Sequence, residues 1–239
     1  TVGLLDDCTF RFSQWDPANP KNKYEGTAEQ WEHAQAAMKT ILDDLGVDYD
    51  IGIDEAAFYG PKLDIQYKNV YGKEDTLVTI QIDMLLAERF GMYYVDKDGQ
   101  KKTPVVLHRA ILGSLDRFMA YILEETKGNL PLWLAPVQAM ILPVKNDDEE
   151  LNAYAHDLYG YLLDNNIRAD IDERAEKLGY RVREAQVKKI PYLIILGKQE
   201  AQDGTVSYRL HGQQNTTTVS RDEFLAMLKD EIATKKLSK

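Results

Sequence analysis

The sequence is poor in residues that bind metals or form disulfides. It holds one cysteine, Cys8, and four scattered histidines, His33, His108, His156 and His211. A single cysteine cannot form an internal disulfide, and the histidine spacing matches no closed zinc motif. Any metal site within this chain alone would therefore be incomplete.

Long apolar runs and an excess of positive charge are also missing. No stretch of about 18 apolar residues is present, and the N-terminus, TVGLLDDCTF, lacks the basic-then-apolar order of a secretory signal. We therefore expect no membrane span, no export and a cytoplasmic location. The formal net charge of −10 argues against nonspecific coating of nucleic acid, because phosphate binding draws on clustered lysine and arginine. It does not argue against local basic patches.

The chain is long enough for two domains. Its 239 residues are 44% apolar, and domains usually run to roughly 100–150 residues. The helical pattern before Gly128 ends in GNLPLWLAPVQ, where Gly128 suits a helix cap and Pro131 prevents the helix from resuming. We predict one domain over residues 1–132 and a second over residues 133–239.

The first half predicts an α+β domain. Thr27 and Gln30 have the spacing of a capping box before an apolar helical pattern. Strands are expected at KLDIQYK, at TLVTIQIDM and at the start of VVLHRAILGSLDRF. Alternation in the second strand places Thr79, Gln81 and Asp83 on one polar face. Sequential strands joined by short turns indicate an antiparallel sheet.

The second half alternates strands and helices and ends in an expected hairpin, which predicts a small α/β domain with a mixed sheet. The segment from Arg174 to Lys198, both included, holds seven Lys or Arg residues and two glutamates in an otherwise acidic chain. Helical spacing puts four of the charged residues on one face, opposite an apolar one: Lys177, Arg181, Glu184 and Lys188. This face is either an ordinary solvated surface or an RNA-binding one.

The turn in VVLHRAILGSLDRF places two groups, Arg117 and His108, whose role the sequence leaves open. Arg117 falls in the first turn of a helix, where the macrodipole disfavours a cation by roughly 0.3–1 kcal/mol. An anion such as a phosphate, bound by the free N–H groups after Gly113 and Ser114, would compensate. The alternative is a solvated arginine. His108, at the end of the preceding strand, is by itself either a structural histidine or a metal ligand.

Four segments together carry a resemblance to a known family: AAFYGPKLDIQ, TIQIDMLLAERF, HRAILGSLDRF and PLWLAPVQ. In this order and spacing they resemble threonyl-tRNA synthetases, and HRAILGSLDR is similar to motif 3 of class II aminoacyl-tRNA synthetases. The later half resembles the anticodon-binding domain of these enzymes. The resemblance implies a class II catalytic portion on an antiparallel sheet, ATP- and Mg²⁺-dependent activation of threonine, and transfer to tRNA(Thr) by a homodimeric cytoplasmic enzyme.

The resemblance also implies roles for particular residues. Arg117 and Lys62 would be catalytic, and ATP would be bound by Lys62, Ser114 and Arg117. His108 would be one of three protein ligands of Zn²⁺, whose open position takes the amino and hydroxyl groups of threonine and so selects against valine. The threonine pocket would be lined by Tyr59, Thr79 and Gln81, and the anticodon would be contacted by Arg183, Glu200 and Arg209.

Some expected features of the family are missing from these 239 residues. Motifs 1 and 2 would lie before Thr1, and with them the motif 2 arginine. The other two zinc ligands, which are a cysteine and a histidine, and the editing domain would also lie there. Ala175 stands where the family commonly has a base-contacting asparagine, and residues 76–78, TLV, replace a Gln-Cys-Gly run. We therefore expect threonine–tRNA ligase activity in the full-length protein and an inactive chain on its own. The alternative is a noncatalytic synthetase-like module that binds RNA or a protein.

Overall fold

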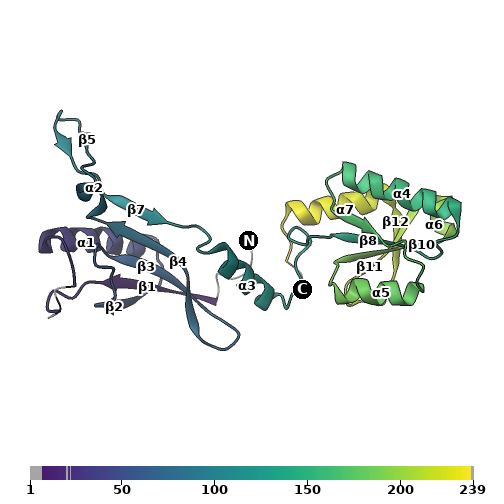
Figure 1. Ribbon diagram of the computed structural model, residues 1–239, viewed down its shortest axis with the longest axis horizontal. Helices are drawn as coiled ribbons and strands as arrows, with labels where there is room; N and C mark the ends of the chain where they lie inside the picture. The colour runs from purple at the N-terminus through teal and green to yellow at the C-terminus, as the bar shows by residue number, and fades with distance from the viewer. Residues whose placement is uncertain (1–6, 20, 22, 238–239) are drawn as a thin grey trace. The chain divides into compact units, whose positions relative to one another are not determined.

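The computed structural model describes residues 7–19, 21 and 23–237 of the chain (Figure 1). Its contacts divide the described residues into two compact units, with the boundary in the sequence between Tyr121 and Ile122. Pro20 and Asn22 lie outside the described residues. The domain boundary predicted after residue 132 stays a prediction. None of the helices in the described part of the chain has both the length and the hydropathy needed to span a bilayer.

The N-terminal unit is built on a five-stranded sheet in the order β2-β1-β3-β4-β7. Its strands are β1 (Cys8–Gln14), β2 (Asp50–Ile53), β3 (Lys62–Lys68), β4 (Glu74–Asp83) and β7 (Val106–Arg109). All neighbouring pairs are antiparallel, as predicted, except β1 and β2, which run parallel because α1 (Ala28–Asp44) connects them.

One face of this sheet packs on α1, whose predicted capping box is confirmed. Phe12 of β1 and Leu63 of β3 are buried against Met38 and Leu42 of the helix. Alternation along β4 therefore turns its other row of side chains away from this core. Beyond β4 come the short helix α2 (Leu86–Arg89) and a two-stranded hairpin of β5 (Tyr94–Val95) and β6 (Lys101–Lys102).

A β-bulge interrupts the pairing of β3 with β4. Ile65 is opposite Val78, but the next residue, Gln66, is opposite Thr76, so Leu77 is the extra residue on β4. Leu77 is buried. The bulge falls within residues 76–78, TLV.

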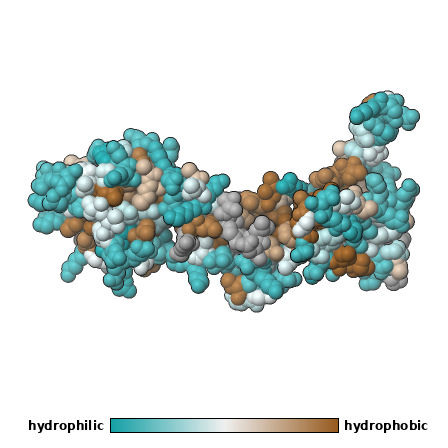
Figure 2. All heavy atoms as spheres, turned by 180° about the vertical axis from the view of Figure 1, so that it is seen from behind, coloured by the Kyte–Doolittle hydropathy of each residue, from teal (hydrophilic) through white to brown (hydrophobic). Residues whose placement is uncertain are grey.

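The helix α3 (Leu115–Glu125) follows β7, and its apolar stripe is only partly buried. Ile122 is buried, whereas the exposed fractions of Leu115, Met119 and Leu123 are 68%, 46% and 43%. Hydrophobic patches among hydrophilic residues are visible at the surface in Figure 2. The predicted cap is confirmed, because Gly128 has a φ of 77° and its N–H donates to the Leu123 carbonyl at 2.9 Å.

The C-terminal unit has a mixed five-stranded sheet, as predicted, in the order β12-β11-β10-β8-β9. β8 (Ala139–Pro143), β9 (Ala169–Ile171) and β10 (Tyr192–Leu196) are parallel, and β11 (Thr205–Leu210) and β12 (Thr217–Ser220) form the predicted closing hairpin. The helices α4 (Glu149–Asp164) and α7 (Arg221–Ala233) cover one face and α5 (Leu178–Val187) the other, while α6 (Lys198–Asp203) follows β10 (Figure 1).

Candidate functional site

Four of the predicted site residues lie together on the polar face of the N-terminal sheet. The strand register pairs Lys62 of β3 with Gln81 of β4, and Gln81 with His108 of β7. Thr79 lies two residues before Gln81 and therefore on the same face. Residues from three separate segments of the sequence thus form one row across the sheet.

Tyr59 joins this row from the loop before β3. Its hydroxyl donates to Oε1 of Gln81 at 2.5 Å, and its ring centroid lies 6.2 Å from that of His108. The next residue, Gly60, lets this loop approach β4 closely, since a Cβ there would come within 1.9 Å of the Ile82 carbonyl oxygen. Burial raises the pKa of the Tyr59 hydroxyl above its usual value, and the negative charge of Asp83 adds to the effect.

Asp83 holds the other side of His108 and was not singled out as a site residue from the sequence. Its Oδ2 lies 2.9 Å from Nε2 of His108, and its Oδ1 accepts the N–H groups of Leu85 and Leu86 at 3.0 and 2.9 Å. Burial acts to raise the pKa of the Asp83 carboxyl, but the hydrogen bonds from His108 and the two backbone groups outweigh it and lower the pKa. Asp83 is therefore ionised near neutral pH and fixes the imidazole.

A zinc site is not complete among the described residues of this unit. Among the described residues, no group of three or more His, Cys, Asp or Glu side chains is placed to hold a metal ion. His108 with one neighbouring carboxylate falls short of the three protein ligands of a catalytic zinc. The residues present here therefore do not fit the ion by themselves.

A buried carboxylate, Asp64, organises the middle of the polar face and was also missed from the sequence. Asp64 is 4% exposed, forms an ion pair with Nζ of Lys62 and accepts the hydroxyl of Thr79 at 2.7 Å. The hydroxyl of Ser13 lies 3.5 Å from the same carboxylate. Asp64 thus fixes the predicted ATP-binding lysine and one predicted threonine-pocket residue in the same place.

The turn before α3 contacts the bulge in β4. Gly113 has a φ of 62°, and a Cβ on it would lie 1.9 Å from the Leu77 carbonyl oxygen. In the first turn of the helix, Nη1 of Arg117 donates to the Thr76 carbonyl at 2.8 Å, and the Arg117 N–H donates to the hydroxyl of Ser114 at 3.4 Å. Arg117 is exposed, but its guanidinium is held against the strand that carries Thr79 and Gln81.

Of the predicted anticodon-binding residues, Arg209 lies in β11, and Glu200 of α6 contacts the same strand. Arg209 is opposite Leu193, which packs under α5, so Arg209 is on the α5 face of the sheet. Its Nη2 donates to Thr216 at 3.3 Å, while its buried Nε has no hydrogen-bond partner. Ser207, two residues earlier on the same face, donates its hydroxyl to Glu200 at 2.7 Å.

The Glu200 carboxylate is also held by its own helix, because it accepts the Gly197 N–H at 2.8 Å at the start of α6. Burial acts to raise the pKa of Glu200, but the hydrogen bonds from Ser207 and Gly197 outweigh it and lower the pKa. Glu200 is therefore an ionised acceptor at neutral pH. Arg183, the third predicted residue, is exposed on α5.

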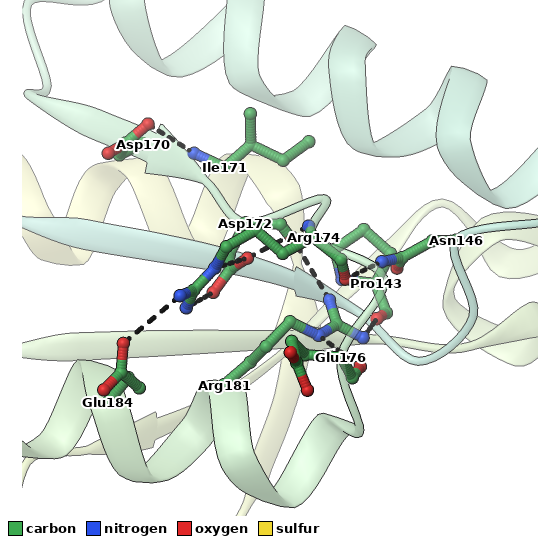
Figure 3. Close-up of polar contacts among 9 residues, drawn as sticks. All are labelled: Pro143, Asn146, Asp170, Ile171, Asp172, Arg174, Glu176, Arg181 and Glu184. Carbon is green, nitrogen blue, oxygen red and sulfur yellow. Dashed lines mark hydrogen bonds and ion pairs between the residues drawn. The ribbon is translucent and has the colours of Figure 1, made fainter.

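The expected charged face of α5 is wrong at one position. Lys177 and Lys188 are exposed and Ala185 is buried, as predicted. Arg181, however, is 1% exposed, because its guanidinium turns inward and donates to main-chain carbonyls (Figure 3). Ala185, four residues later, lies on the same side of the helix and is also buried, so Arg181 is at the boundary between the charged and the apolar face.

Comparison with known proteins assigns each unit to a family. Residues 15–126 match the tRNA synthetase class II core domain (G, H, P, S and T), and residues 138–231 match an anticodon binding domain. Threonine–tRNA ligase of Clostridium perfringens is 46% identical over 233 residues, which cover 98% of this chain and 36% of the relative. The Listeria monocytogenes enzyme is 46% identical over 229 residues, which cover 96% of this chain and 35% of the relative. The chain thus spans about a third of the length of these relatives.

Solved structures agree in fold over both units. The RNA binding domain of threonyl-tRNA synthetase from Cryptosporidium parvum superposes with a TM-score of 0.82 at 32% identity, covering 94% of this chain and 55% of that one. A putative threonyl-tRNA synthetase from Aeropyrum pernix gives a TM-score of 0.77 at 26% identity, covering 98% and 56%. The chain therefore consists of core-domain sequence of class II tRNA synthetases followed by an anticodon-binding domain, and proteins similar to it over nearly its whole length are threonine–tRNA ligases.

Proposed function

We propose that this chain is part of a threonine–tRNA ligase, which uses ATP and Mg²⁺ to activate threonine and transfers the threonyl group to tRNA(Thr). The observation that carries the proposal is the row formed by Lys62, Gln81 and His108, with Tyr59 and Thr79 beside it. From the family resemblance we also propose that the full-length enzyme is a homodimer that works in the cytoplasm.

In the N-terminal unit, the proposed threonine pocket is the polar face around Gln81. The Tyr59 hydroxyl and the Gln81 amide are already hydrogen-bonded to each other, so both are oriented before a substrate arrives. Thr79 is oriented by Asp64 in the same way. We propose that His108, fixed by Asp83, supplies one ligand to a zinc ion whose other ligands come from outside this chain.

The proposed ATP contacts are electrostatic. Lys62 and Arg117 supply two cationic groups, and the first turn of the helix after Ser114 adds backbone N–H groups. A guanidinium that already donates to the Thr76 carbonyl keeps further N–H donors for phosphate oxygens. These groups would stabilise negative charge on the triphosphate when the threonine carboxylate attacks the α-phosphate.

In the C-terminal unit, we propose that Arg183, Glu200 and Arg209 contact the anticodon. Guanidinium and carboxylate groups can read the edges of splayed single-stranded bases. Arg209 suits this role because its buried Nε lacks a partner. A polar atom in this state is expected to gain from a ligand that satisfies it.

The test is binding of a fluorescent anticodon stem-loop of tRNA(Thr) to the 239-residue chain, followed by anisotropy. Arg209→Ala should weaken binding by about 1–3 kcal/mol if Arg209 reads a base edge. Arg221→Ala is the matched control, since Arg221 pairs with Asp157 on α4, at the opposite face of the sheet, and should change affinity little. Affinity should also fall as salt rises. Equal binding of an unrelated anticodon loop would contradict the proposal.

A further inference from the structure

Arg181 is a buried charge in the middle of the C-terminal unit. It sits in the first turns of α5, is 1% exposed and donates through all three guanidinium nitrogens to main-chain carbonyls. Nη1 donates to Asp172 at 2.7 Å, Nη2 to Pro143 at 2.7 Å and Nε to Glu176 at 3.2 Å (Figure 3). One side chain thus joins three segments of backbone.

These three segments meet at one edge of the sheet. Pro143 ends β8, Asp172 follows β9, and Glu176 precedes α5. The parallel strands β9, β8 and β10 are neighbours in that order, and their crossover helices α4 and α5 lie on opposite faces of the sheet. The carboxyl edge at such a switch in strand order is where open α/β sheets bind ligands.

Arg181 contacts the buried side of segment 172–177, through the carbonyls of Asp172 and Glu176. The other side of the segment faces solvent. Arg174, Ala175 and Lys177 are all exposed. Around Arg174 a second set of contacts fixes the same segment. The Arg174 guanidinium donates to the Asp172 carboxylate at 2.9 and 2.7 Å, and the side-chain amide of Asn146 donates to the Arg174 main-chain carbonyl.

Stability alone does not explain why the charge of Arg181 is buried. A guanidinium taken out of water loses its hydration, and buried charged networks can often be replaced by apolar side chains of similar size without loss of stability. What an apolar side chain cannot do is hold three carbonyls at fixed relative positions, which needs the planar donor fork of arginine. The specific contribution of Arg181 is therefore the geometry of segment 172–177.

We propose that Arg181 is a positioning residue for RNA recognition, which holds segment 172–177 in the conformation that contacts the anticodon loop. This inference rests on the proposed function of the C-terminal unit. Arg181 does not touch the RNA itself, since its side chain is buried beneath the segment. Its loss should therefore reduce discrimination between anticodon loops rather than the number of phosphate contacts.

A matched control is present in the same unit. Arg168 also donates to main-chain carbonyls, with Nε and Nη2 to Ala135 at 3.0 and 2.8 Å and Nη2 to Trp133 at 3.1 Å. It does so just before β9 and β8 begin, at the amino ends of the parallel strands. Replacing Arg168 therefore removes the same kind of contact at the end of the sheet away from segment 172–177.

The experiment compares Arg181→Lys with Arg168→Lys in the 239-residue chain. Affinities for the tRNA(Thr) anticodon stem-loop and for one with an unrelated loop are measured at several salt concentrations, well below both melting temperatures. Arg181→Lys should bind the tRNA(Thr) loop about tenfold more weakly, the loss expected for one base contact, with the unrelated loop and the salt slope unchanged. Arg168→Lys should lower the melting temperature without changing the ratio of the two affinities.

A second variant acts on the segment from outside and leaves the buried charge in place. Asn146→Ala removes the side-chain donor to the Arg174 carbonyl and should reduce the affinity ratio in the same direction. An unchanged ratio in both Arg181→Lys and Asn146→Ala overturns the inference, as does an equal loss of ratio in Arg168→Lys. If the wild-type chain does not distinguish the two loops, the proposed anticodon role is overturned, and the inference falls with it.

Discussion

Replacing Gly113 by alanine should destabilise the N-terminal unit by more than the positive φ of this residue alone would cause. Gly113 has a φ of 62° and sits against the bulge in β4, where a Cβ would lie 1.9 Å from the Leu77 carbonyl oxygen. Gly91 offers a matched control. Its φ is 61°, and a Cβ on it would meet nothing within 4 Å.

The two substitutions share one cost and differ in another. An L-residue in the left-handed region costs roughly 1–2 kcal/mol, which applies equally at both positions. At Gly113 the Leu77 carbonyl must also move by more than 1 Å to reach the 3.0 Å that real Cβ atoms keep. Forcing extra volume into a packed site adds about 1–3 kcal/mol. We expect Gly113→Ala to lower the free energy of unfolding by about 2–5 kcal/mol in total, and Gly91→Ala by about 1–2 kcal/mol.

The measurement is urea unfolding followed by tryptophan fluorescence in a Trp133→Phe background. The two remaining tryptophans, Trp15 and Trp31, stack with ring centroids 5.3 Å apart in the N-terminal unit, so the signal reports that unit. A difference between Gly113→Ala and Gly91→Ala below about 0.5 kcal/mol, the usual range for harmless surface changes, would refute the reasoning.

Three further substitutions test the polar face. Asp64→Ala should lower the free energy of unfolding by about 2–4 kcal/mol, because Lys62 and Thr79 lose a buried acceptor; a smaller loss in urea titration would contradict this. The lowered pKa of Asp83 means that its charge stabilises the fold above about pH 4 and that this contribution is lost as the pH falls through the folded pKa. Wild type should therefore lose stability more steeply below about pH 4 than Asp83→Asn, and parallel curves would refute this. In the full-length enzyme, His108→Ala should abolish threonine-dependent pyrophosphate exchange, and normal exchange would argue against a metal-ligand role.

Local signals in the sequence predicted much of the fold. The capping box at Thr27 marks the start of α1, because a side-chain oxygen followed three residues later by Gln or Glu satisfies the first N–H groups of a helix. Alternation predicted the polar row of Thr79, Gln81 and Asp83 for a similar reason, since neighbouring side chains of a strand point to opposite faces.

Features that depend on distant partners could not be read in this way. The bulge at Leu77 is visible only when β4 is paired with β3. Asp64 alternates like any polar strand residue, yet it is buried because Lys62, Thr79 and Ser13 surround it. Arg181 lies at the edge of the charged face of its helix, beside the buried Ala185, and three carbonyls from other segments hold its guanidinium inside. Periodicity reports which face a residue occupies and carries no record of what lies against it.

The position of β7 at the end of its sheet bears on how the chain behaves in concentrated solution. A sheet edge offers unpaired backbone groups to another strand, and proteins usually protect such edges with charge or proline. Here Val105 and Leu107 are 60% and 66% exposed beside this edge, with Pro104 before it. The net charge of −10 then supplies much of the colloidal protection, through repulsion between chains. Because salt shortens the range of that repulsion to about 10 Å at 0.1 M, self-association through this edge is expected to grow with ionic strength.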